Sequence, residues 1–377
     1  MSTLLPEDRE AIRQAARTFV RERAPVAHLR ALRDARDPLG YSRELWREMA
    51  SLGFAGMTIP QRFGGGGLGF MEQGAVLEEL GRNLVPAPIV SAILGAGALA
   101  LGGADELQSI LSRVCMGEQV VALAHEEGRR YAPYAVSTRA ERAGPGFVLH
   151  GEKSFVIDGY GADAFVVVAR TAGPTGQRDG LTLFLVPSGT PGVSTERLDL
   201  VDSRNVARVR FDSVRVLERD VVGWFDGGAD VLDAVVTRAT AALAAEMLGG
   251  MAEVFDRTLA YLKTRKQFGV YIGSFQALKH RTAWMFCELE LTRSLVLEAL
   301  QAIDAEREDA PLLASAAKAR ASDTYVLVAN EAIQMHGGIG VTDDLDIGLY
   351  LKRARVAEQT LGSAAYHVDR VATLQKY

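Results

Sequence analysis

The spacing of apolar and polar residues divides the chain into three zones. Over 1–118, apolar residues recur at helical spacing, as in EAIRQAARTFVRERA, and Glu7 and Asp8 precede that run. This period and acids in a first turn both favour amphipathic helices. Gly53 ends a second such run, SRELWREMASLG, and is a plausible C-terminal cap. We expect an all-helical domain over 1–118, with its last helix over 104–117.

Between residues 119 and 222 the period changes. Short segments rich in Val and Phe, such as GFVLHGEKSFVI and ADAFVVVAR, are separated by Gly, Pro, Asp and Ser. Turn residues at intervals of roughly 8–12 positions are typical of the strands of a sandwich or barrel. We therefore expect a β domain over 119–222.

Helical spacing returns after residue 223 in four long runs, the first beginning DVLDAVVTRATAALAAEMLGG. Long apolar helices with short connections indicate a four-helix bundle over 223–377. The predicted fold class is therefore α+β, with a helical domain, a β-barrel or sandwich, and a helical bundle in that order. The run GGGGLG (64–69) follows no strand, so we reject a Rossmann or P-loop interpretation.

Composition narrows the classes of partner. The net charge of −5 and the pI of about 5.8 argue against nucleic acid, because phosphate binding normally needs a basic surface. Two distant cysteines, Cys115 and Cys287, support neither a disulfide framework nor a zinc cluster, and a reducing cytoplasm fits them. The first 25 residues lack the pattern of a secretory signal. No apolar run reaches the roughly 18 residues that a membrane span needs, so we expect no membrane partner.

Several segments resemble signatures of the acyl-CoA dehydrogenase family. They are TRKQFGVYIGSFQALKHR (264–281), QMHGGIGVTDDLDIGLYLKRAR (334–355), IPQRFGGGGLG (59–69) and GEKSFVIDGYGADAFVVVAR (151–170), and the order of the zones agrees. The resemblance covers essentially the whole chain. It implies an oxidoreductase of fatty acid metabolism that carries FAD between the β domain and the bundle and assembles as a dimer of dimers. It also implies an acyl-CoA substrate, α-proton removal by a base, hydride transfer from the β-carbon to the flavin, and reoxidation by an electron-transferring flavoprotein.

The family motifs imply one group of FAD contacts at the adenosine end. Arg265 would reach the pyrophosphate of a neighbouring subunit's FAD, and a planar guanidinium that is always charged suits that role. Phe268 would pack by the adenine and Gln276 would give amide contacts. A further set would bring bare peptide N–H groups to the adenosine diphosphate portion: Gln334, Gly337 and Gly338. Taken singly, Arg265 could be a surface salt bridge and the glycine pair a plain helix terminator.

At the flavin ring, the match is less complete. Phe155 occupies the place of an aromatic residue that usually flanks the isoalloxazine. Ile157 stands where the family often has a threonine, so a hydroxyl contact is missing or is made by backbone. The segment LAHEEGRRYAP (123–133) replaces a turn that usually carries threonine and serine. His125 with Glu126 and its neighbour could mimic a metal pair, but no third ligand has sensible spacing, so we expect no metal.

The position of the usual catalytic base holds no acid. Counting from the family-like KRAR segment, the glutamate that precedes a glycine in most members corresponds to Leu361, followed by Gly362. Some relatives place the glutamate on the long helix before the RKQFG motif, and that position is Ala239. Neither side chain can accept a proton, whereas a positioned base contributes roughly 10²–10⁴-fold to such a reaction.

One acid on that long helix looks internal. Glu246, in AALAAEMLGG, is flanked by small residues that suggest close helix packing. A buried carboxylate would have its pKa raised towards that of a working base, so Glu246 is a weak candidate. The alternative is a structural acid paired with a buried donor.

Three hypotheses remain open. The chain is one subunit of a heteromeric acyl-CoA dehydrogenase whose other chain carries the base, and its pattern is most similar to small subunits of the pimeloyl-CoA dehydrogenase type. Alternatively, the chain is self-sufficient and uses another base such as Glu246. Finally, it is a redeployed member that binds FAD or an acyl thioester without dehydrogenation.

Overall fold

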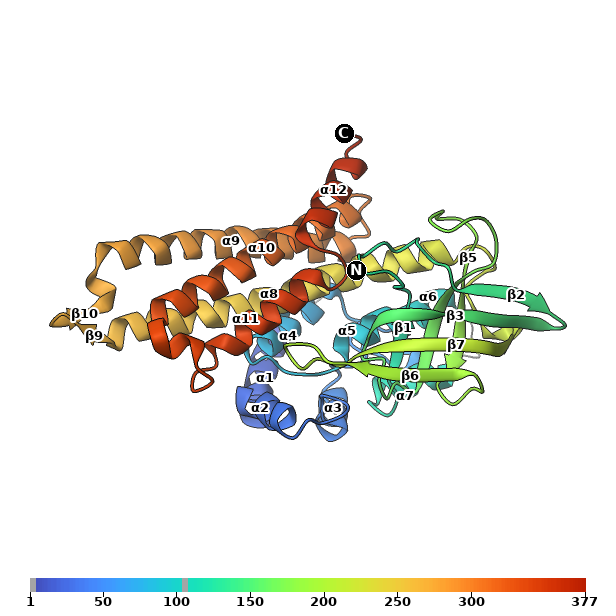
Figure 1. Ribbon diagram of the computed structural model, residues 1–377, viewed down its shortest axis with the longest axis horizontal. Coiled ribbons are helices and arrows are strands. Elements are labelled where there is room, and N and C mark those ends of the chain that lie inside the picture. The colour runs from blue at the N-terminus through green and yellow to red at the C-terminus, as the bar shows by residue number, and fades with distance from the viewer. Residues whose placement is uncertain (1–4, 104–107) are drawn as a thin grey trace.

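The structure is a computed structural model that describes residues 5–103 and 108–377. The first four residues and the beginning of the helix expected over 104–117 lie outside the described residues. Helices pack at one side of a single sheet, and a bundle of long helices extends away from it (Figure 1). Among the described residues, no helix is both long and apolar enough to cross a membrane.

The N-terminal zone is helical, as predicted. A helix that the sequence analysis missed, α2, follows α1 directly after Pro25. Beyond α3, Gly53 has φ +82°, a left-handed conformation that glycine adopts without strain. The helices are α1 (Pro6–Arg23), α2 (Val26–Asp34), α3 (Arg43–Ser51), η1 (Gln61–Phe63), α4 (Phe70–Arg82), α5 (Ile89–Ser91), η2 (Ala92–Ala96), α6 (Gly97–Gly102) and α7 (Gln108–Cys115).

The middle zone forms one mixed sheet whose strand order is β6-β7-β3-β2-β4-β5-β8, with β1 parallel to β4. Its strands are β1 (Val121–Ala124), β2 (Arg139–Ala143), β3 (Gly146–Ile157), β4 (Ala164–Arg170), β5 (Leu181–Pro187), β6 (Val193–Leu198), β7 (Val206–Leu217) and β8 (Val221–Val222), with η4 (Glu218–Asp220) before the last.

Alternate residues of the strands enter two different cores. On β4, Phe165 and Val167 join a core enclosed by the sheet, whereas Val166 and Val168 join the large core shared with the helices. The rings of Phe165 and Phe211 meet edge to face at 6.4 Å although β4 and β7 are not neighbours in the sheet. The sheet therefore curves around its own core, in agreement with the sandwich or barrel that the spacing of turn residues predicted.

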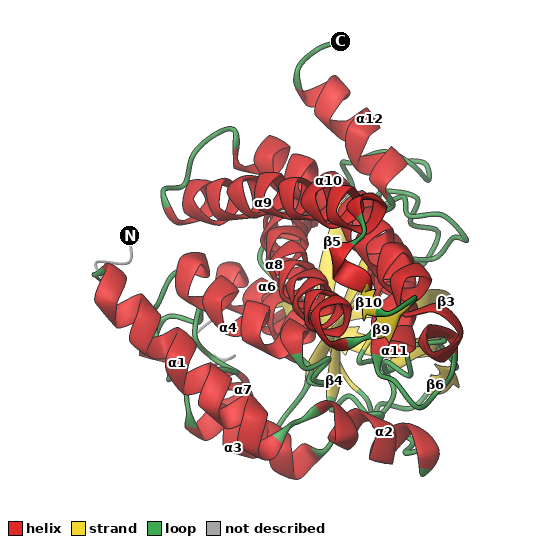
Figure 2. Cartoon of the chain, turned by 90° about the vertical axis from the view of Figure 1, so that its left-hand side faces the viewer, coloured by secondary structure: helices red, strands yellow, loops and turns green. Residues whose placement is uncertain are grey.

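The third zone is the predicted bundle, seen nearly end-on in Figure 2. The first long run ends at Thr264, and a small hairpin that the sequence analysis missed follows it. The last run breaks into α11 and α12. The elements are α8 (Gly228–Thr264), β9 (Lys266–Gln267), β10 (Val270–Tyr271), η5 (Ile272–Ser274), α9 (Gln276–Asp304), α10 (Ala310–His336), η6 (Gly337–Val341), α11 (Ile347–Gln359) and α12 (Ala364–Leu374).

Candidate active site

The turn between α11 and α12 contains no group that can accept a proton from a substrate. Leu361 is fully buried and has φ +56°, and Gly362 follows with φ +105°. A leucine in the left-handed region is uncommon and persists only where surrounding contacts hold it. The turn is therefore a fixed structural feature in which an apolar side chain occupies the position of the expected base.

Two buried side chains hold this turn. Lys318 Nζ donates hydrogen bonds to the carbonyl oxygens of Glu358 (3.1 Å) and Gly362 (3.0 Å). His367 Nε2 donates to the carbonyl oxygen of Leu361 at 3.0 Å. Burial lowers the pKa of Lys318 to about 7, and burial with the nearby Lys318 lowers the pKa of His367 to about 3. His367 is therefore neutral near pH 7 and acts as a donor to backbone.

Glu246 lies inside an ion-pair cluster between the sheet and the bundle. Its carboxylate bonds Arg204 and also Arg353, whose Nη1 lies 3.0 Å away. Burial alone would raise the pKa of Glu246, but the two guanidinium groups outweigh it and lower the pKa. The expectation of a raised pKa is therefore wrong, because Glu246 has buried cationic partners that the sequence pattern does not reveal.

Asp158 is the third carboxylate of this cluster. Asp202 accepts a hydrogen bond from Arg353 at 2.7 Å. The charges of Glu246 and Asp202 therefore already balance those of the two arginines. Asp158 is buried without an ion pair to any described residue, and burial raises its pKa to about 7. It directly follows Ile157 at the end of β3, so this cluster joins the strand expected at the flavin ring to the bundle.

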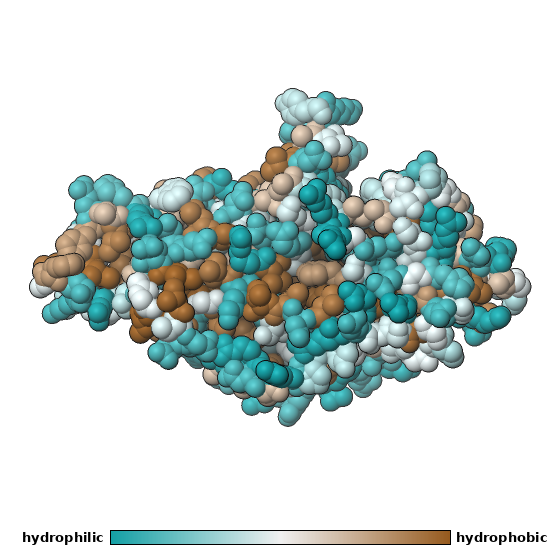
Figure 3. Space-filling view, viewed as in Figure 1, coloured by the Kyte–Doolittle hydropathy of each residue, from teal (hydrophilic) through white to brown (hydrophobic). Residues whose placement is uncertain are grey.

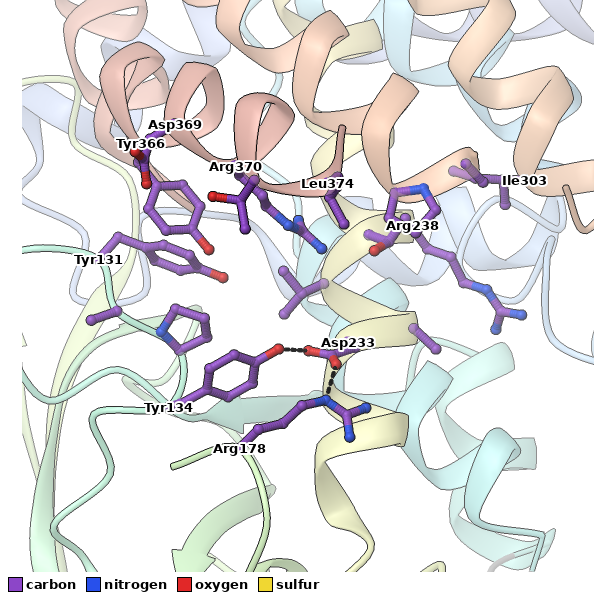
Figure 4. A pocket seen from close by; sticks show the side chains of 18 of the residues that line it. Tyr131, Tyr134, Arg178, Asp233, Arg238, Ile303, Tyr366, Asp369, Arg370 and Leu374 are labelled. Atoms are coloured by element: carbon purple, nitrogen blue, oxygen red, sulfur yellow. Dashed lines mark hydrogen bonds and ion pairs between the residues drawn. The ribbon is translucent and has the colours of Figure 1, made fainter. Parts of the chain in front are cut away.

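A cavity of about 840 Å³ opens between α8, α12, the start of α10 and the loop after β1. Figure 4 shows Tyr131 and Tyr366 on one wall and Asp233 with its partners on another. The Asp233 carboxylate accepts hydrogen bonds from Tyr134 (2.6 Å) and Arg178 (2.9 Å). The turn at Leu361 and Gly362 adjoins the cavity, because a Cβ at Gly362 would lie 3.2 Å from Tyr131 Cδ1, and Tyr131 lines the cavity.

The predicted adenosine-end residues come together at the far end of the bundle. Arg265 directly follows α8, Phe268 lies in the β9–β10 hairpin, and Gln276 begins α9. Gln334 lies near the end of α10, which is tied to α8 by the stacked rings of Tyr261 and His336, 4.4 Å apart.

These residues form an open surface that suits a dinucleotide. The Phe268 ring is 91% exposed, and Arg265 makes no ion pair with a described residue. Nothing lies within 4 Å of a Cβ built on Gly337 or Gly338, so a ligand could approach this backbone closely. The donors and the space both fit a negatively charged diphosphate beside an aromatic base.

Phe155 lies near the end of β3, three residues before Asp158 of the buried cluster. The hairpin that carries Phe268 follows α8, and the part of α8 between Glu246 of that cluster and this hairpin is about 28 Å long. One chain does not bring the two groups together. This separation agrees with the resemblance, which implies that the adenosine-end residues reach the FAD of a neighbouring subunit.

Sequence reasoning undervalued one acid beside the cavity. Glu126 is buried, burial raises its pKa to about 8, and its Oε1 has no hydrogen-bond partner among the described residues. His125 Nε2 is 3.8 Å away, and burial and the charge of Lys153 lower the pKa of that imidazole to about 3. No group of three or more His, Cys, Asp or Glu residues in the described ranges could hold a metal ion.

The family follows from comparison with known proteins. Models of the acyl-CoA dehydrogenase N-terminal, middle and C-terminal domains match residues 6–118, 122–214 and 226–374. The chain belongs to the acyl-CoA dehydrogenase family. Its cofactor is FAD, and its activity class is the FAD-dependent oxidation of acyl-CoA.

Individual relatives of this acyl-CoA dehydrogenase span the same length. It is 32% identical to acyl-CoA dehydrogenase IpdE2 of Mycolicibacterium smegmatis, over 97% of this chain and 98% of that protein. The solved ChsE4-ChsE5 complex from Mycobacterium tuberculosis superposes with a TM-score of 0.88 at 29% identity, covering 100% and 99% of the two chains. The Tcur3481-Tcur3483 steroid ACAD gives 0.89 at 30% identity, with 99% of each chain covered.

Proposed function

We propose that this chain is one subunit of a heteromeric FAD-dependent acyl-CoA dehydrogenase, and that the partner chain supplies the catalytic base. The observation that carries this proposal is the turn at Leu361, which is buried and whose carbonyl oxygens accept hydrogen bonds from the side chains of Lys318 and His367. Ala239, the second expected position, is also fully buried. A thioester α-proton needs a positioned acceptor, and neither site offers one.

The split of the cofactor residues supports assembly with a second chain. In this proposal Arg265, Phe268 and Gln276, with Gln334 and the adjacent glycine pair, hold the adenosine end of a neighbour's FAD. FAD, when bound, accepts the hydride from the substrate β-carbon. This chain contributes charge, an aromatic surface and open backbone to that cofactor.

The exposed apolar surface of the bundle supports the same assembly. Hydrophobic residues gather over the helical half of the face in Figure 3 more than over the sheet. On α9, Trp284, Phe286 and Leu291 are each about half exposed. Trp284 and Leu291 are seven residues apart and share one face of the helix, and exposed apolar side chains on one face are typical of protein interfaces. Two relatives, the ChsE4-ChsE5 complex and the Tcur3481-Tcur3483 steroid ACAD, are named for two chains, and the same arrangement is proposed here.

The cavity between α8 and α12 is the proposed site of the acyl thioester. It adjoins the turn at Gly362, and Tyr131 and Tyr366 form its inner wall. An electron-transferring flavoprotein is the proposed electron acceptor, in keeping with the family.

The test compares the purified chain with the chain co-expressed with a family member that carries a glutamate at either base position. We expect the pure chain to bind FAD whose absorbance does not change when acyl-CoA is added. In the co-expressed complex, acyl-CoA should bleach the flavin absorbance rapidly. Bleaching of the pure chain at a full rate would contradict the two-chain proposal. A protein that stays free of flavin after reconstitution would contradict the assignments of Arg265 and Gln334.

A self-sufficient enzyme is the second candidate, and one observation favours a specific residue for it. Glu126 lies by Tyr131 with a raised pKa and an unpaired oxygen, whereas Glu246 is paired with two arginines. If the pure chain bleaches, Glu126→Gln should abolish the reaction and leave FAD content unchanged. Loss of bleaching in Glu246→Gln with Glu126→Gln active would instead assign the base to Glu246.

A further inference from the structure

Four arginines line the cavity, and two of them are already neutralised. Arg178 forms ion pairs with Asp230 and with Asp233, the latter at 2.9 Å. Arg307 binds Asp309 at 2.6 Å. Each of these guanidinium groups has its charge satisfied by the protein, so neither calls for a ligand.

The side chains of the other two arginines, Arg238 and Arg370, point in different directions. The Arg238 guanidinium lies 5.9 Å from the centre of the Phe70 ring and points out of the cavity in Figure 4. The Arg370 side chain points into the cavity from α12 (Figure 4). No hydrogen bond or ion pair joins the Arg370 guanidinium to another residue of the described ranges. Asp369 and Glu306 also line the cavity, but neither bonds it.

Two tyrosine hydroxyls accompany Arg370. Tyr366 precedes it by one helical turn, and its ring meets the Tyr131 ring edge to face at 4.8 Å. The Tyr131 hydroxyl is buried and has no hydrogen-bond partner among the described residues. Burial raises the pKa of both tyrosines, so both hydroxyls remain protonated near pH 7 and can donate.

This set of donors lacks an acceptor. A guanidinium offers several N–H donors in one plane, which match the paired oxygens of a carboxylate or phosphate. A buried hydroxyl left without a partner is costly, and such groups are normally satisfied by protein, water or ligand. The other lining residues are apolar, belong to the satisfied ion pairs, or, like Asp369 and Glu306, form no hydrogen bond or ion pair with these donors.

We propose that Arg370, with the hydroxyls of Tyr131 and Tyr366, binds an anionic group of the thioester substrate. The group is either a carboxylate on the acyl chain or a phosphate of the CoA carrier, since both present paired anionic oxygens. This inference rests on the proposed function, because it assumes that the cavity holds the thioester.

The experiment measures thioester binding to the FAD-containing protein by titration calorimetry. The ligands are heptanoyl-CoA, pimeloyl-CoA and the pantetheine thioesters of both acids. They separate the two sources, because pimeloyl adds a terminal carboxylate and pantetheine lacks the nucleotide phosphates. Arg370→Gln is compared with wild type and with Arg47→Gln, an exposed arginine of α3 that does not line the cavity.

We expect Arg370→Gln to weaken binding of the recognised ligands by roughly ten- to a hundredfold, the typical cost of a lost charged hydrogen bond. Arg47→Gln should bind as wild type does. Weakening of both CoA thioesters alone assigns a phosphate, and weakening of both pimeloyl thioesters alone assigns the acyl carboxylate. Equal binding of every ligand to wild type and Arg370→Gln would overturn the inference and leave the proposed function intact.

A second variant covers the case in which Arg370→Gln loses its flavin. Tyr131→Phe keeps the ring contacts with Tyr366 and removes only the hydroxyl, so a loss of about threefold or more is expected for the same ligands. Unchanged binding in Tyr131→Phe would then overturn the site. If wild type binds no thioester at all, the proposed function and this inference both fail.

Discussion

Lys318 Nζ lies 3.0 Å from the carbonyl oxygen of Gly362, and this hydrogen bond fastens α10 to the turn where the family usually places its base. The same ammonium also bonds the carbonyl oxygen of Glu358, at the end of α11, and the hydroxyl of Ser322. A cation at a helix C-terminus is favourable because the last carbonyls carry partial negative charge. The base-free turn is thus stabilised by the protein itself.

Replacing this lysine should change how stability depends on pH. The pKa of Lys318 falls from 10.5 to about 7 in the folded chain, so between these values the unfolded chain binds more protons. Stability therefore rises with pH through this window, by at most about 1.4 kcal/mol per pH unit. Lys318→Met should remove that rise, which urea unfolding at pH 7 and pH 9.5 would measure. If the free energy of unfolding changes equally between the two pH values in the variant and in wild type, the protonation of Lys318 is not linked to folding.

Replacing Asp158 tests a pH dependence of stability that is opposite in sign to that of Lys318. Its pKa rises from 3.8 to about 7 on folding, so the folded chain binds more protons between these values and stability falls as pH increases. Asp158→Asn removes the titration and tolerates the left-handed backbone found there, with φ +51°. We expect the stability of the variant relative to wild type to increase between pH 5 and pH 7, and the difference reached at pH 7 to persist at pH 8. A constant difference across this range would contradict the buried, unpaired carboxyl.

The sequence predicted the three zones because the spacing of apolar residues and the turn residues between segments are local properties of the chain. It did not predict α2, because its nine residues follow α1 with only Pro25 and a neighbour between them. The sequence did not predict the hairpin that carries Phe268, since helical spacing continues up to it in the sequence. Glu246 was misjudged because Arg204 and Arg353 come from segments distant along the chain, and pairing across domains leaves no local signal. Arg370 could not be predicted because Tyr131, which lines the same cavity, lies far from it in the sequence.

Breaking the buried cluster should be costly. Glu246→Gln leaves Arg204 and Arg353 without their shared carboxylate, and removing one partner of a buried pair typically costs about 3–5 kcal/mol. Urea unfolding should show this loss, and adding Arg204→Met should recover part of it. Glu253→Gln is the matched control, since its pairs lie near the surface and are worth roughly 1 kcal/mol or less. Similar losses in the two single variants would contradict the importance of the cluster.

Restoring a carboxylate at the turn offers a test that needs no flavin turnover. Leu361→Glu would place an acid where the two-chain proposal says one is absent, in the turn whose next residue, Gly362, lies against Tyr131 of the cavity wall. The purified variant should exchange the α-protons of an acyl-CoA with deuterated water at least about a hundredfold faster than wild type, because a positioned base contributes that much to proton transfer. Mass spectrometry of the recovered thioester measures the exchange directly. Ala365→Glu, on the exposed side of α12, controls for a carboxylate that is merely nearby. If wild type already exchanges as fast as Leu361→Glu, this chain has its own base and the partner is not needed for that step.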